Sequence, residues 1–175
     1  FTVDEVAQFL VDGERVSSSL VREALNRGDL ERATRLLGRP YRMAGRVRLG
    51  KKLGRQLGFP TANLALHRKV VPLWGIFAVR ASGAGLVDHP AVASLGTRPT
   101  VDGTDPLLEV HLFDWEGDLY GRYLDVDFVT RLRDEQKALL SRFATIEVAR
   151  DLRDQGFAIG GRRLRLALIA GPAMF

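Results

Sequence analysis

The sequence contains no cysteine, which excludes disulfides and thiolate metal sites and fits a reducing compartment. Its three histidines, His67, His89 and His111, lie far apart and do not have the spacing of metal ligands. No apolar run approaches the roughly 20 residues that a membrane helix needs, and the first residues carry no signal-peptide pattern. We therefore expect a cytoplasmic protein without a membrane partner.

The two commonest nucleotide-binding motifs are also missing, since the chain has neither a P-loop nor a G-x-G-x-x-G sequence. The net charge of +5 comes mainly from arginines, which are scattered among acidic residues rather than gathered in one block. A basic balance attracts phosphate-bearing partners. Aromatic and basic residues are not interleaved as in proteins that bind single-stranded nucleic acid. We therefore expect small-molecule substrates and no nucleic acid.

At 175 residues the chain has room for one ordinary domain and a fragment of a second. The apolar spacing from Leu20 to Leu25, preceded by serines, predicts a helix with a serine cap. A second short helix is expected from Leu30 to Leu37, and the Gly-Arg-Pro sequence that follows favours a domain boundary. We divide the chain accordingly into a helical segment, residues 1–38, and a module, residues 39–175.

The module is rich in short β-type segments separated by Gly, Pro and Asp. Strands are expected at residues 42–48, 75–81, 91–95, 107–113 and 123–128. A turn is expected at 96–100, helices at 130–140 and 145–153, and an edge strand within 162–175. The prediction is a mainly β protein, a small antiparallel β-barrel with C-terminal helices, preceded by a short helical N-terminal segment.

The densest local pattern is the glycine-rich stretch GKKLGRQLGFP at residues 50–60. Glycines spaced by four residues let backbone N–H groups approach an anion closely, and basic side chains beside them add charge. The residues concerned are Gly50, Lys51, Gly54, Arg55 and Gly58. This spacing predicts generic phosphate binding, while a plain glycine hairpin would account for it equally well.

Two polar residues follow this stretch directly. Pro60 biases Phe59 toward an extended backbone, so a stiff turn is expected to lead into a strand that carries Thr61 and Asn63. Residues two apart on a strand face the same way. A hydroxyl and an amide oxygen on one face suit a hard cation such as Mg²⁺. A structural Thr–Asn turn motif is the alternative.

The stretch LLEVHLF, residues 107–113, alternates apolar and other residues as a strand does. Glu109 and His111 fall on the same face. Phosphoryl transfer to an alcohol needs a carboxylate near the hydroxyl proton, so Glu109 is the candidate general base. The alternative is a solvated glutamate on an exposed face, and His111 is expected to be structural.

The sequence GRQLGFPTANL resembles the G-R-x-x-G-F-P-T-A-N-L signature of riboflavin kinases, including the kinase half of bifunctional FAD synthetases. The resemblance implies that ATP and riboflavin are substrates, that FMN and ADP are products, and that Mg²⁺ is the cofactor. It implies that Thr61 and Asn63 bind Mg²⁺ and contact nucleotide and flavin. It also implies a nucleotide-covering loop made of Gly50, Lys51, Gly54, Arg55, Gly58, Phe59 and Pro60.

Two further stretches resemble the same family. E-V-H-L-F-D-x-x-x-D-L-Y-G matches the stretch that holds the catalytic glutamate, which maps to Glu109. L-R-x-E matches the start of a helix beside the flavin, which makes Arg133 a flavin-side candidate; a surface ion pair is the alternative. A barrel that binds flavin or nucleotide without turnover is the second functional hypothesis.

The N-terminal segment resembles the end of the adenylyltransferase half of FAD synthetases. Its V-S-S-S-x-x-R sequence is similar to the I-S-S-T-x-I-R element that helps to bind ATP phosphates there, with Ser17, Ser18 and Arg22 as counterparts. The resemblance implies a parent protein with an adenylyltransferase module. The nucleotide-binding sheet that would complete that site is absent from this chain. The oligomeric state stays open, with a homo-oligomer among the alternatives.

Overall fold

The computed structural model describes residues 8–49, 61–68, 70–100, 103–133, 158–159 and 162–163. The N-terminal elements are β1 (Leu10–Val11), β2 (Glu14–Arg15), α1 (Ser18–Asn26) and α2 (Leu30–Leu37). The elements that follow are β3 (Tyr41–Arg48), β4 (Ala62–Ala65), β5 (Gly75–Gly83), β6 (Leu86–Thr100), β7 (Gly103–Leu112), β8 (Tyr123–Arg133), β9 (Ala158–Ile159) and β10 (Arg162–Arg163). Among these residues no helix is long and apolar enough to cross a lipid bilayer.

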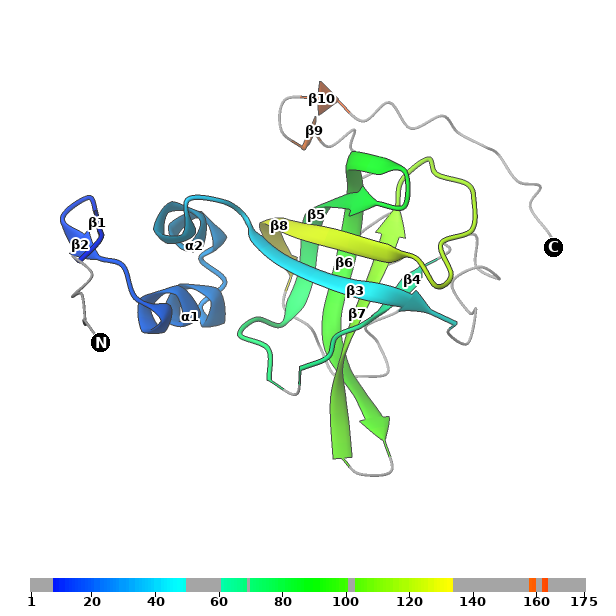
Figure 1. Cartoon of the computed structure of the whole chain (residues 1–175), viewed down its shortest axis with the longest axis horizontal. Helices are drawn as coiled ribbons and strands as arrows, with labels where there is room; N and C mark the ends of the chain where they lie inside the picture. The colour runs from blue at the N-terminus through cyan, green and yellow to red at the C-terminus, as the bar shows by residue number, and fades with distance from the viewer. Residues whose placement is uncertain are drawn as a thin grey trace, which may run out of the picture.

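The two helices begin and end where local chemistry favours it. The Ser17 hydroxyl accepts a hydrogen bond from the backbone N–H of Leu20 at 3.3 Å, which caps α1. Asp29 caps α2 in the same way through Arg32. Gly38 ends α2 with a φ of 67°, a left-handed conformation that glycine adopts without strain. Helix α2 contacts β3 and β8, so the helical pair lies beside the barrel (Figure 1).

Ser17→Ala is expected to lower the free energy of unfolding by about 1 kcal/mol, because it removes the side chain that caps α1. Thermal or urea unfolding of the variant measures this loss. Ser19→Ala is the matched control, since Ser19 is exposed inside the same helix and does not cap it. Equal stability of Ser17→Ala and the unsubstituted chain would contradict the capping role.

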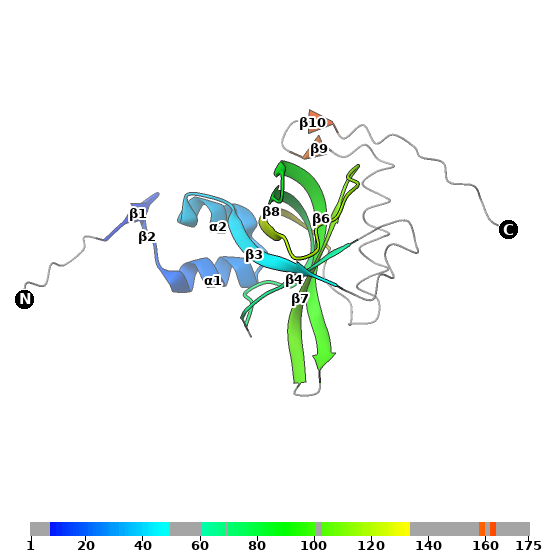
Figure 2. The same ribbon diagram turned by 45° about the vertical axis from the view of Figure 1, so that its right-hand side comes forward.

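Six strands form a closed antiparallel barrel in the order β3-β4-β7-β6-β5-β8, with β8 pairing back to β3. Figure 2 shows the strands wrapping around a common axis, with the helical pair to one side. Alternate residues point inward and are buried, as on β3 from Met43 to Val47. The interior includes an edge-to-face contact between Phe77 and Phe128, whose ring centroids are 5.1 Å apart. The predicted small antiparallel barrel is confirmed.

Strands β6 and β7 are longer than predicted and form an arm that projects from the barrel (Figures 1 and 2). Residues 96–100 pair with residues 103–107 along this arm. The predicted turn at 96–100 is therefore wrong. Cross-strand pairing gives these residues an extended backbone, so Pro99 lies within a strand and does not mark a turn.

The predicted start of a helix at residue 130 is also wrong. Thr130 and Arg131 continue β8 and pair with Ala78 and Phe77 of β5, so their backbone groups join the barrel ladder. These residues form a strand because β5 lies beside them and pairs with their backbone, a fact that the local sequence does not reveal. Residues 134–140 and 145–153, predicted as helical, lie outside the described part. Within the predicted edge strand, residues 162–163 form β10, which pairs with β9.

Candidate functional site

The candidate base Glu109 lies in the middle of β7, on the outer face of the barrel. Its neighbours Leu108 and Val110 belong to the interior core. Because side chains alternate along a strand, Glu109 and His111 point to the opposite, outer face. Glu109 is nevertheless only 5% exposed. A buried carboxylate flanked by core residues is held by a rigid strand, as a positioned base requires.

The barrel aligns several of the candidate residues in one cross-strand row. Glu109 pairs with Asn63 of β4 on one side and with Ser94 of β6 on the other. The row continues from Ser94 to Ile76 of β5, and from Ile76 to Arg133 at the end of β8. Cross-strand partners have Cβ atoms about 4.5–5.5 Å apart. Residues far apart in the sequence are thus brought to one level of the barrel.

The outer face around this row is shielded from water. Ile76 and Val92 are fully buried, although neither belongs to the barrel core. Ser94 is 2% exposed, and the buried ring of His111 packs edge-on against Phe113 with centroids 5.6 Å apart. Charge–dipole interactions are stronger where water is excluded. The part of the row around Glu109 and Ser94 is therefore a water-excluded environment and not an open surface.

Thr61 and Asn63, the predicted Mg²⁺ ligands, lie at the start of β4. Asn63 is half-buried and faces outward, because Ala62 and Leu64 on either side of it are interior. Thr61, also half-buried, directly precedes the strand. Their side chains make no hydrogen bond to another described residue. An amide and a hydroxyl oxygen, with the Glu109 carboxylate beside them, form the all-oxygen set that Mg²⁺ prefers.

No cluster of three His, Asp or Glu residues suited to a metal ion occurs within 8–49, 61–68, 70–100 and 103–133. A cation at Thr61 and Asn63 would therefore keep most of its waters or share phosphate oxygens, as Mg²⁺ commonly does. The predicted nucleotide-covering residues lie outside the described part: Gly50, Lys51, Gly54, Arg55, Gly58, Phe59 and Pro60. Arg133 is the last residue of β8 and not the start of a helix, and only its backbone is described.

Sequence reasoning missed two polar residues that pair with the candidate residues, Ser94 in the row and Arg48 beside it. Ser94 falls within a short apolar stretch, where nothing local marks the outer face as buried. Arg48, exposed at the end of β3, pairs with Asn63 and so places a cation beside the candidate metal ligands. Both could have been found only from strand register, which depends on contacts between distant segments.

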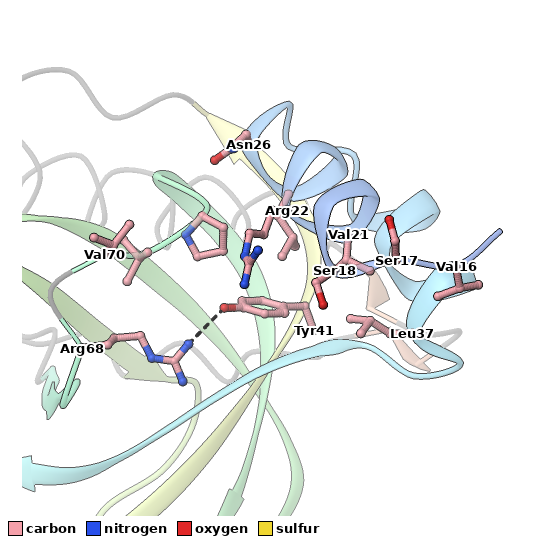
Figure 3. A pocket seen from close by; sticks show the side chains of 13 residues that line it. Val16, Ser17, Ser18, Val21, Arg22, Asn26, Leu37, Tyr41, Arg68 and Val70 are labelled. Carbon is pink, nitrogen blue, oxygen red and sulfur yellow. Dashed lines mark hydrogen bonds between the residues drawn. The ribbon is translucent and has the colours of Figure 1, made fainter. Parts of the chain in front are cut away.

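A separate hollow of about 910 Å³ lies between α1 and the segment that follows β4 (Figure 3). Figure 3 shows Arg22, Tyr41 and Arg68 turned toward it, and Arg68 Nη1 donates to the Tyr41 hydroxyl at 3.3 Å. Burial raises the pKa of Tyr41 above its ordinary value, an effect that the Arg68 charge and hydrogen bond partly offset. Tyr41 is therefore neutral at physiological pH.

Three residues singled out in the N-terminal segment, Ser17, Ser18 and Arg22, all line this hollow. The Ser17 hydroxyl is already used in capping α1. Asn26 adds a polar side chain, and the remaining lining residues are apolar: Val16, Val21, Leu25, Leu37, Val70, Val71 and Pro72. The hollow thus combines two cations with apolar walls, at the junction between the helical segment and the barrel.

Comparisons with known proteins point to one family. A family model described as "Flavokinase: Riboflavin kinase" matches residues 37–147. The bifunctional riboflavin kinase/FMN adenylyltransferase of Pseudomonas fluorescens is 51% identical over 148 residues, which cover 84% of this chain and 46% of that protein. The enzyme of the same name from Haemophilus influenzae is 47% identical over 137 residues, covering 78% and 44%. The chain therefore spans less than half the length of these relatives.

A solved structure also matches. It is titled as a macrolide-efflux protein from Streptococcus pneumoniae, and it superposes with a TM-score of 0.68 at 33% sequence identity. The match covers 83% of this chain and 50% of that one. Its title names a different activity, whereas both sequence relatives carry the kinase name.

Proposed function

The chain belongs to the riboflavin kinase family, and we propose that its barrel transfers the γ-phosphate of ATP to the 5′-hydroxyl of riboflavin, giving FMN and ADP. The observation that carries this proposal is the pairing of Glu109 with Asn63. It sets a carboxylate beside the residues that would bind the metal. Phosphoryl transfer depends mainly on positioning and charge stabilisation, and this pairing supports the positioning of a base beside a metal site.

Glu109 is the general base of the proposed reaction. Its carboxylate accepts the proton of the riboflavin 5′-hydroxyl as that oxygen attacks the phosphorus. The strand holds the carboxylate in place, because the neighbouring residues of β7 are locked into the barrel core. Burial of the site excludes water, which would otherwise compete with riboflavin as the acceptor.

Mg²⁺ fits the oxygen donors at the start of β4, with Thr61 and Asn63 as its protein ligands. When bound there, the ion would neutralise charge on the phosphate oxygens of ATP. The glycine-rich residues 50–60 precede these ligands directly in the chain, so we assign them to the nucleotide side. Arg133, at the far end of the row, is assigned to the flavin side.

Residues 8–38 are proposed as the end of an adenylyltransferase module, with the kinase module beginning at residue 39. Support comes from the family model, which begins at residue 37, and from Gly38, which ends α2 just before the barrel starts. The names of the relatives support a parent protein with both activities. Cytoplasmic location and oligomeric state stay predictions from the sequence.

Incubation of the chain with riboflavin, ATP and Mg²⁺ is expected to yield FMN and no FAD. The kinase site is built from residues of this chain, whereas the adenylyltransferase segment is only the end of its module. Chromatography with flavin fluorescence separates the two products. FAD formed from FMN and ATP would overturn the module assignment. Flavin binding without FMN would instead favour a barrel that binds but does not turn over.

A further inference from the structure

Ser94 is a polar residue of the row to which the proposed reaction assigns no part. It lies on β6, directly across from Glu109 and on the side away from Asn63. Its neighbours Ala93 and Leu95 belong to the barrel interior, so the Ser94 side chain points to the same outer face as Glu109. Ser94 is 2% exposed.

The Ser94 hydroxyl forms no hydrogen bond with another described residue. Polar side chains in a water-excluded site are usually hydrogen-bonded to the protein, to water or to a ligand. The Ser94 hydroxyl, next to the candidate base, is therefore open to a partner outside the described residues. A ligand in the site is the natural source of that partner.

The order of the strands indicates which part of the ligand lies there. Asn63 on β4 is assigned to the metal and phosphate side of Glu109, so we place the alcohol on the other side of Glu109, toward β6. Ile76, the next residue of the row after Ser94, is apolar and completely buried. Among the described side chains of the row, Ser94 is the polar group on the alcohol side of the base.

We propose that Ser94 binds the acceptor, by hydrogen-bonding a ribityl hydroxyl next to the one that is phosphorylated. This inference rests on the proposed kinase reaction. The 4′-hydroxyl is the neighbour of the reacting 5′-hydroxyl, and Ser94 is the neighbour of Glu109 across the strand pair. Ser94 is thus a specificity residue, which favours acceptors with hydroxyls on adjacent carbons over simple primary alcohols.

The test compares Ser94→Ala with the unsubstituted chain on two acceptors, riboflavin and 4′-deoxyriboflavin. With riboflavin, the substitution is expected to raise KM roughly 3- to 10-fold, the effect of one lost hydrogen bond, and to change kcat less. With 4′-deoxyriboflavin, which lacks the proposed partner, the substitution should change KM by less than about 2-fold, since the effects of interacting groups are not additive.

An equal increase in KM on both acceptors, or an unchanged KM for riboflavin, would overturn the proposal. Ser82→Ala is the matched control, because that serine lies on β5 outside the row and accepts a hydrogen bond from the Asp88 backbone N–H at 3.0 Å. Ser94→Cys, similar in size, replaces the variant if Ser94→Ala does not fold. If the unsubstituted chain forms no FMN at all, the proposed kinase reaction fails, a result distinct from failure of the Ser94 proposal.

Discussion

Glu109→Gln is expected to slow FMN formation roughly 100- to 10,000-fold, the usual contribution of a positioned general base. The amide has nearly the size and shape of the carboxylate but cannot accept the proton of the riboflavin hydroxyl. Because Glu109 sits on a strand between core residues, the substitution should leave the barrel intact. Initial rates at saturating ATP, Mg²⁺ and riboflavin measure the loss, and riboflavin binding should persist.

Glu116→Gln provides the control, because it replaces a carboxylate by an amide at a position outside the row. Glu116 is exposed and lies beyond the end of β7. Glu109→Asp keeps the carboxylate but shortens the side chain, so its rate should lie between those of Glu109→Gln and the unsubstituted chain. An unchanged rate in Glu109→Gln would remove the base assignment.

Asn63→Ala is expected to raise the Mg²⁺ concentration needed for half-maximal FMN formation by at least roughly 10-fold. Removing a residue that only hydrogen-bonds to a metal ligand already weakens metal binding or activity by roughly 10- to 100-fold. Loss of a ligand itself should cost at least the lower of these values. Asn63 is the half-buried residue directly across from Glu109, and its amide oxygen is the proposed ligand. Titration of the initial rate with MgCl₂ at fixed ATP gives the value.

Asn26→Ala is the control for this experiment, because Asn26 ends α1 and lies outside the row. A metal dependence that is identical in Asn63→Ala and the unsubstituted chain would show that this amide does not bind the ion. Lower activity at every Mg²⁺ concentration, with no change in the half-maximal value, would instead assign Asn63 to substrate positioning.

Local signals in the sequence predicted much of the fold. Serine before an apolar helical spacing predicted α1, and the Gly-Arg-Pro sequence predicted the end of α2. Alternation predicted that Glu109 and His111 would share one face of a strand, and in the structure that face lies opposite to the core residues Leu108 and Val110. These signals succeed because caps, breaks and alternation depend on neighbours in the sequence.

Other features depend on partners distant in the sequence. Thr130 and Arg131 join β8 because β5 offers them backbone partners. The pairing of Asn63, Glu109 and Ser94 follows from strand register across β4, β7 and β6. This register cannot be predicted from the sequence pattern of any one segment. Ser94 was missed for this reason, and the motif residues Asn63 and Glu109 were found without evidence that they meet.

The order of the strands has a consequence for how activity is lost on unfolding. Asn63, Ser94, Glu109 and Arg133 come from four strands, and Glu109 meets Asn63 and Ser94 across two seams, β4–β7 and β7–β6. A partly unfolded chain that opened either of these two seams would separate the base from the metal ligands or from the acceptor side, whereas a chain that lost only the pairing of β3 would keep the three residues together. We therefore expect activity to be lost when β4, β7 and β6 come apart, whichever of the other strands remain paired.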